Sequence, residues 1–173
     1  MSFLCILGLL QVPFVLTQMV QSDGTIYVTH ASLPPTLVAL TPHGVVKWKI
    51  ELPVQSPDLC DAGGNTTSVT EPAWHPSTSN VAVAVRQCCG YIFQYGTPCS
   101  GTTVHQISTK TSSLVWSTKF DRDKGKEGDV TSLQLGTTPV SPHDGSVFVR
   151  DNGKETLIAL DASDGHVMWE TRV

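Results

Sequence analysis

LDASDGHVMWETRV, residues 160–173, is the stretch of sequence that decides the predicted fold. The apolar run that leads into it, TLIALD at 156–161, predicts a strand, and the Asp-Gly pair that ends at Gly165 is a strong signal for a hairpin turn. After the turn, apolar and polar residues alternate around Trp169, which is typical of a second strand. The stretch therefore predicts an antiparallel hairpin with a tryptophan four residues after its turn glycine.

The same arrangement occurs twice more in the sequence. TLVALTPHGVVKWKIEL, residues 36–52, places Trp48 four residues after Gly44. TVHQISTKTSSLVWSTKF, residues 103–120, keeps the strand, the turn region and Trp116, but a serine replaces the glycine. Three tryptophans in one local context indicate an internal repeat.

A further hairpin precedes each tryptophan hairpin. An Asp-Gly turn at 23–24 comes before the strand TIYVTH, and another at 144–145 comes before SVFVRD. In the middle unit, Ser-Asn at 79–80 takes this place before VAVAV. Each unit is therefore predicted to contain four antiparallel strands.

Three such units cover about residues 12–53, 72–120 and 136–173, and together they form a predicted domain over 12–173. Units of four strands that repeat every ~40–50 residues are the sequence sign of a β-propeller. The predicted fold class is therefore all-β, a partial propeller of about three four-stranded antiparallel blades. An ordinary antiparallel sandwich is the alternative, because its hairpins have similar spacing.

The repeated residues are interpreted as structural and not as a ligand cage. Propeller blades pack face to face, so a large flat side chain at a fixed place fills the gap between neighbours, contributing on the order of a few kcal/mol per blade. The turn glycines supply the positive φ that tight hairpins need. The predicted structural repeat residues are Trp48, Trp116, Trp169, Gly44, Gly165 and Asp161. Of the histidines, His30 and His105 are expected to be partly buried in hydrogen-bonded structural roles.

An apolar segment opens the sequence at residues 1–11. It is interpreted either as a signal-like segment or as the lead into the first strand, since no basic residue precedes it and no small-x-small cleavage site follows it. The apolar run falls short of the ~20 residues that a membrane helix needs. Membrane association is expected only through such a signal segment.

Four of the five cysteines fall in one window, and they are the candidates for disulfide bonds: Cys60, Cys88, Cys89 and Cys99. Disulfides in an oxidising compartment, free thiols and, with less suitable spacing, a zinc site are the three alternatives. Asn65 begins the N-glycosylation sequence NTT. Both features favour an extracytoplasmic or secreted protein.

The charge pattern does not predict a nucleic-acid partner. The net charge is −4, and the densest charged run, DRDKGKEGD, mixes both signs, whereas phosphate-binding surfaces need clustered Lys and Arg. The sequence contains no glycine-rich phosphate loop, G-x-S-x-G, H-E-x-x-H or calcium-loop motif. No catalytic or metal-binding residue is therefore predicted.

LIALDASDGHVMWE, residues 157–170, resembles the repeat of the pyrroloquinoline-quinone-like (PQQ-like) β-propellers, and residues 37–49 are similar to it. The resemblance implies one of two kinds of protein. Some members of the family are quinoprotein dehydrogenases that hold the quinone and a calcium ion, and others are scaffolds without a cofactor, such as the bacterial factor that helps to insert outer-membrane proteins. The sequence QCCG at 87–90 resembles the vicinal disulfide of the dehydrogenases. In the alternative interpretation, Cys88 or Cys89 pairs with Cys99 and closes the intervening loop.

The resulting hypothesis is a non-catalytic propeller scaffold or protein-interaction module that uses no cofactor. Its expected partner is another protein or further blades of the same propeller, because three blades leave sheet faces unpaired. The sequence ends on a repeat strand, which favours a truncated propeller. The alternatives are a fragment of a PQQ-dependent dehydrogenase with a Cys88–Cys89 disulfide, which would bind PQQ and calcium, and a ligand-binding propeller.

Overall fold

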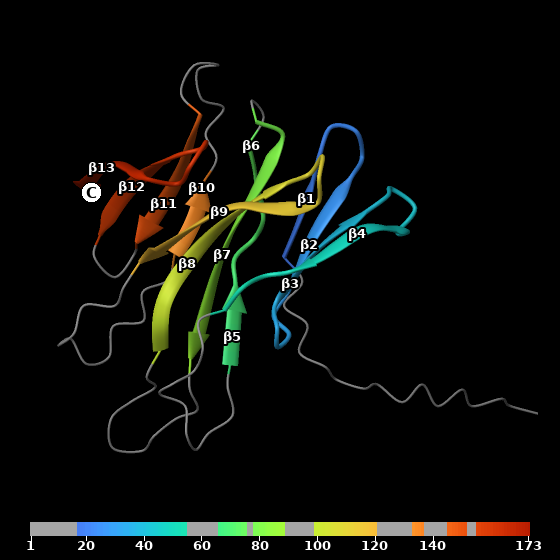
Figure 1. The fold of residues 1–173 in the computed structure, drawn as a ribbon, viewed down its shortest axis with the longest axis horizontal. Coiled ribbons are helices and arrows are strands. Elements are labelled where there is room, and N and C mark those ends of the chain that lie inside the picture. The colour runs from blue at the N-terminus through green and yellow to red at the C-terminus, as the bar shows by residue number, and fades with distance from the viewer. Residues whose placement is uncertain are drawn as a thin grey trace, which may run out of the picture.

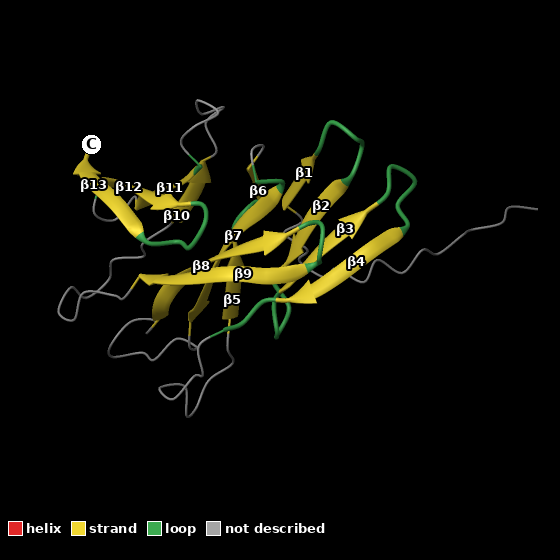
Figure 2. Cartoon of the chain, turned by 45° about the horizontal axis from the view of Figure 1, so that its top comes forward, coloured by secondary structure: helices red, strands yellow, loops and turns green. Residues whose placement is uncertain are grey.

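The structure is a computed structural model that describes residues 17–54, 66–75, 78–88, 99–120, 133–136, 145–151 and 155–173. Within these ranges every regular element is a β-strand, and all strand pairs are antiparallel (Figure 2). The strands form three sheets that follow one another along the chain (Figure 1). The predicted all-β fold of about three antiparallel blades is therefore confirmed. Among the described residues, no helix is long and apolar enough to span a membrane.

The first blade is a four-stranded sheet in sequential order. Its strands are β1 (Thr17–Val20), β2 (Ile26–His30), β3 (Thr36–Leu40) and β4 (Val46–Glu51). The turn between β1 and β2 contains Gly24 at φ +79°, and the turn between β3 and β4 contains Gly44 at φ +78°. Both glycines adopt the left-handed conformation that other residues avoid, so the two Asp-Gly-type turn signals correspond to real tight turns.

The middle blade contains five strands, because two short strands pair with the same neighbour. β5 (Thr66–Val69) and β6 (Ala73–His75) both pair with β7 (Asn80–Cys88), which is followed by β8 (Cys99–Ser108) and β9 (Ser113–Phe120). The repeat pattern placed the start of this unit near residue 72, whereas the structure begins its pairing at Thr66. TTSV has no apolar alternation, so β5 carries no strand signal of its own.

The third blade repeats the order of the first. Its strands are β10 (Leu133–Gly136), β11 (Ser146–Asp151), β12 (Thr156–Asp161) and β13 (Val167–Arg172). The turn between β12 and β13 contains Gly165 at φ +77°. In the middle blade the corresponding turn contains Ser112, which also adopts a positive φ, of 52°.

The three blades share one register at their last strand pair. Ala39 lies opposite Trp48, Gln106 opposite Trp116, and Ala159 opposite Trp169, and one residue later the register shifts in all three blades. Such a shift is a β-bulge, which bends a strand and increases its twist. The bulge therefore places each tryptophan at an equivalent point of its blade.

The core lies between the blades in two clusters. The first joins Tyr27, Leu37 and Ala39 of the first blade to valines of β7 and to Ile107. The second joins Ala82, Ala84, Val104 and Trp116 of the middle blade to apolar residues of β11 and β12. Alternate residues of β7 contribute to different clusters, because successive side chains of a strand point to opposite faces. The middle sheet is therefore covered on both faces.

Candidate interaction surface

The joint between the middle and third blades is built on Trp116. Its indole is only 7% exposed, and Nε1 donates a hydrogen bond to the carbonyl oxygen of Ala162 at 3.0 Å. The hydroxyl of Thr118, two residues further along β9, donates to the carbonyl oxygen of Gly165. A Cβ atom at Gly165 would overlap the indole ring of Trp116. The turn glycine of one blade therefore receives the tryptophan of the preceding blade.

The joint between the first and middle blades is also aromatic. Trp48 is partly buried against the first core cluster, with its ring centroid 5.8 Å from that of Tyr27. Tyr27 in turn stacks on Trp74 of β6, with centroids 6.2 Å apart and an interplanar angle of 20°. Aromatic pairs in this geometry contribute about 0.5–1.5 kcal/mol beyond the burial of their area. Trp48 of the first blade and Trp116 of the middle blade thus each lie in the joint with the next blade.

Four positions on the second and third strands of each blade, apolar in every case but His105, form the opposite half of the joint, and we call them the receiving face. The strand registers make these positions equivalent in the three blades. The residues are Ile26, Val28, Val38 and Leu40 in the first blade, Val81, Val83, His105 and Ile107 in the middle blade, and Val147, Val149, Ile158 and Leu160 in the third. All are buried in the middle and third blades, but all four are only half-buried in the first. Among the described residues, no sheet packs against the receiving face of the first blade.

Trp169 occupies the equivalent tryptophan position of the third blade but is 42% exposed. It packs on Phe148 of its own sheet at 5.8 Å and 52°, nearly the geometry of the Tyr27–Trp48 pair. Val167 and Met168 of β13 are each 47% exposed, so the strand presents a continuous apolar stretch to solvent. Exposed apolar surface of this kind marks an interaction site. We call this surface the Trp169 end.

Gly44 lies at the opposite end of the row of blades. Its position in the turn matches that of Gly165, but a Cβ atom added at Gly44 would meet nothing within 4 Å. The half-buried receiving face of the first blade begins beside this turn, at Leu40. We call the turn and this face together the Gly44 end. The described chain thus exposes one half of a joint at each end.

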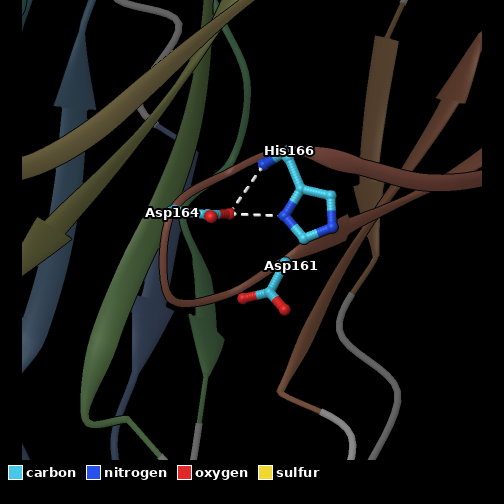
Figure 3. A group of neighbouring side chains, drawn as sticks. All are labelled: Asp161, Asp164 and His166. Atoms are coloured by element: carbon cyan, nitrogen blue, oxygen red, sulfur yellow. Dashed lines mark hydrogen bonds and ion pairs between the residues drawn. The ribbon is translucent and has the colours of Figure 1, made fainter.

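Asp161, Asp164 and His166 form a compact polar group in the turn after β12 (Figure 3). Their potential ligand atoms all lie within 4.8 Å of one another. His166 Nδ1 lies 2.7 Å from Asp164 Oδ1, and the His166 backbone N–H donates to the same oxygen at 3.0 Å. The Ser163 N–H donates to Asp161 Oδ1 at 2.6 Å. These contacts are those of Asx turns, which hold the backbone of a hairpin in place.

The same hydrogen bonds shift the pKa values of the three side chains. Hydrogen bonds from Ser163 lower the pKa of Asp161, and hydrogen bonds from His166 lower the pKa of Asp164. The hydrogen bond to Asp164 raises the pKa of His166. The group is largely exposed to solvent, so its ion pair contributes little to stability. The arrangement accounts for the presence of Asp161 in the repeat as a residue that stabilises the turn.

His105 occupies a receiving-face position where the other two blades have valine or isoleucine. It is 1% exposed, and its Nδ1 lies 2.8 Å from the hydroxyl of Ser117. Burial disfavours the charged imidazolium and lowers the pKa of His105 to about 4. The side chain is therefore neutral at neutral pH and forms part of the joint with the first blade. The sequence identified His105 as a partly buried residue, but not as a member of a joint.

Of the disulfide candidates, Cys88 and Cys99 are direct register partners on β7 and β8. Cys60 and Cys89 lie outside the described residues, as do Asn65 and the segment 1–11. The structure therefore brings the backbones of Cys88 and Cys99 together and leaves the other candidates without a position.

Residues 97–173 match a family model described as "PQQ_2: Outer membrane protein assembly factor BamB". The match covers the third blade and the whole of β8 and β9 in the middle blade. The matched region, residues 97–173, carries PQQ-like propeller repeats. The family resemblance predicted from the sequence is confirmed by this match. No curated protein sequence matches the chain significantly.

Several solved structures align with this chain at low sequence identity. A protein of unknown function from Bacteroides caccae aligns with a TM-score of 0.55 and 14% identity, over 93% of this chain and 47% of that structure. BamB from Moraxella catarrhalis aligns with a TM-score of 0.49 and 13% identity, over 92% of this chain and 39% of that one. Apo AztD from Citrobacter koseri aligns with a TM-score of 0.38 and 13% identity, over 91% and 46%. This chain thus spans about half the length of the structures it resembles or less.

Proposed function

We propose that the chain is a non-catalytic propeller scaffold that binds other proteins through its blade surfaces. The observation that carries this proposal is the Trp169 end, where the consecutive β13 residues Val167, Met168 and Trp169 are all exposed. Interfaces are enriched in aromatic residues and methionine, and an exposed apolar strand at a sheet edge can pair or pack with a partner. The description of the matching family model, an outer membrane protein assembly factor, supports the same function.

We also propose an extracytoplasmic location for this scaffold. The clustered cysteines and the NTT sequence at Asn65 support it, because disulfides and N-glycans form in oxidising, secretory compartments. The family description refers to the outer membrane, which is consistent with that compartment.

The proposed scaffold works without a quinone or a calcium ion, and this distinguishes it from the dehydrogenase alternative. A ligand that binds only the folded state raises the melting temperature of a protein. Because the proposed scaffold does not bind the quinone, addition of pyrroloquinoline quinone with Ca²⁺ to the purified chain is expected to leave its melting temperature unchanged. Dye-linked alcohol oxidation, measured in the same mixture, is expected to stay at the level of the quinone alone. A stoichiometric thermal shift together with alcohol oxidation would contradict the scaffold proposal. Ca²⁺ alone is the control.

A further inference from the structure

The joint between blades occurs twice within the chain, and each joint has two halves. One half is a tryptophan from the last strand of a blade, and the other is the receiving face of the next blade together with its turn. The Trp169 end is an unmatched first half, and the Gly44 end is an unmatched second half. The two exposed ends of one chain are therefore complementary to each other.

The Trp169 end repeats the residues that make the joint formed by Trp116. Thr118 follows Trp116 by two residues and donates a hydrogen bond across that joint, and Thr171 follows Trp169 at the same spacing. The register agrees, because Thr118 lies opposite Val104 and Thr171 opposite Leu157, at equivalent positions of their blades. Both hydrogen-bond donors of the Trp116 joint thus have a counterpart on β13.

The Gly44 end repeats the residues that accept these two hydrogen bonds in the Trp116 joint. Gly44 has the same φ as Gly165, within one degree, and it lies four residues before its tryptophan as Gly165 does. Pro42 follows the last residue of its strand, Leu40, by two residues, as Ala162 follows Leu160. The carbonyl oxygens of Pro42 and Gly44 therefore take the places of the two acceptors of the Trp116 joint, in a turn that is one residue shorter, because Val46 follows its partner Leu40 by six residues and Val167 follows Leu160 by seven. Open space lies where the indole would enter.

We propose that the Trp169 end of one copy of this chain docks on the Gly44 end of a second copy, head to tail. The same contact in the reverse direction closes the pair into a ring, since two copies of three blades make a six-bladed propeller within the usual range of about four to eight blades. In each contact Trp169 Nε1 donates to the carbonyl oxygen of Pro42, and the hydroxyl of Thr171 donates to that of Gly44. The Bacteroides caccae structure, of which this chain covers 47%, has the fold in a chain about twice as long.

This self-association deepens the proposed scaffold function and rests on it, because the same Trp169 end carries both proposals and a second copy of the chain would be the protein that it binds. The quinone experiment tests the scaffold and leaves the ring untouched, whereas a mass measurement tests the ring alone. The failure of one proposal can therefore be distinguished from the failure of the other.

Sedimentation equilibrium of the whole chain over a dilution series tests the proposal. The expected result is a reversible dimer of twice 18.6 kDa. Trp169→Ala and Gly44→Ala are each expected to raise the dimer dissociation constant roughly tenfold or more, because a buried tryptophan anchor is typical of an interface hot spot. Leu114→Ala, which removes an exposed leucine of the middle blade, is the matched control and should leave the dissociation constant unchanged.

A mixture of the two variants distinguishes a head-to-tail contact from any other. The Trp169→Ala copy keeps an intact Gly44 end, and the Gly44→Ala copy keeps an intact Trp169 end, so the mixture regains one complete joint and is expected to associate more tightly than either variant alone. Circular dichroism of each variant verifies that its sheets are retained. A chain that is monomeric at every concentration, or a dimer that neither variant weakens, would overturn the proposal.

Discussion

At the scale of single residues, a comparison of Gly165 with Gly44 separates the backbone cost of replacing a turn glycine from the steric cost of the added Cβ atom. Both adopt a φ near +78°, so an alanine at either position pays the left-handed conformational cost of about 1–2 kcal/mol. Only at Gly165 would the added Cβ also overlap an indole ring, that of Trp116. The difference between the two positions therefore reports the packing of the joint itself.

We predict that Gly165→Ala lowers the free energy of unfolding by more than Gly44→Ala does, by roughly a further 1–3 kcal/mol for overpacking. Urea unfolding measures both values, with each variant made in a Trp169→Ala background so that contact between copies makes no contribution. Equal losses at the two positions would show that Trp116 moves aside without cost.

His105 makes stability depend on pH. Its folded pKa of about 4 lies below the ordinary value of 6.5, so the unfolded chain binds the proton more tightly than the folded chain does. This contribution to stability is complete above pH 6.5 and is lost as the pH falls toward 4. The full loss is on the order of 3 kcal/mol from this group.

We predict that His105→Val, which introduces the residue of the equivalent position in the first blade, flattens the fall in unfolding free energy between pH 6.5 and 4. Some slope remains, because burial also lowers the pKa of His75. His166→Asn is the control: His166 is exposed and its pKa is shifted in the opposite direction, so this variant should not flatten the curve. If the slope is unchanged in His105→Val, protonation of His105 is not the cause of the fall in unfolding free energy between these pH values.

The sequence predicted which residues repeat but not all of the contacts they make. The positions of Trp48, Trp116 and Trp169 are visible because tryptophan is rare and its spacing to the turn is constant. The contact of Gly165 with Trp116 joins residues of different blades, and no local pattern encodes it. The same reason applies to His105, whose burial depends on the sheet packed against it and not on its own strand.

At the scale of strands, hairpins were predictable where a turn signal and an alternating run coincide. β12 and β13 have both, and their bounds match the predicted strands closely. β5 has neither, and it is held in place by pairing with β7 and by the packing of Val69 against the first core cluster. The β-bulge just before each tryptophan was not predicted, because a bulge is a property of two paired strands and one strand alone does not reveal it.

The pairing of β7 with β8 sharpens the disulfide hypothesis. Cys88 and Cys99 are opposite each other in the register, and directly opposed residues of antiparallel strands have Cα atoms ~4.5–5.5 Å apart, within the range that a disulfide spans. We predict that protein from an oxidising compartment contains a Cys88–Cys99 bond, formed by thiol–disulfide exchange in which the two thiols lose two protons and two electrons to an existing disulfide. Peptide mapping without reduction identifies the linked pair.

Cys89→Ser is the matched variant for this prediction, since it removes the neighbouring thiol and should leave the linked peptide unchanged. Cys88→Ser and Cys99→Ser should each abolish it. A Cys88–Cys89 linkage would contradict the prediction and favour the vicinal pair that the dehydrogenases contain.

At the scale of the whole molecule, the two core clusters of the described residues join each blade to the next one along the chain. The middle blade is covered on both faces, and the outer blades on one face each. Stability in such an arrangement is approximately a sum of blade terms and joint terms. The number of blades was predictable from the repeat, whereas the exposed ends were identified only when burial could be compared at equivalent positions.

Every blade carries both a tryptophan strand and a face that accepts the tryptophan of the blade before it. A gene duplication that copied one whole blade would therefore supply a module already fitted to its neighbours on both sides. Propellers built in this way can change in size by whole modules without the invention of a new contact, and insertions are confined to the loops between strands.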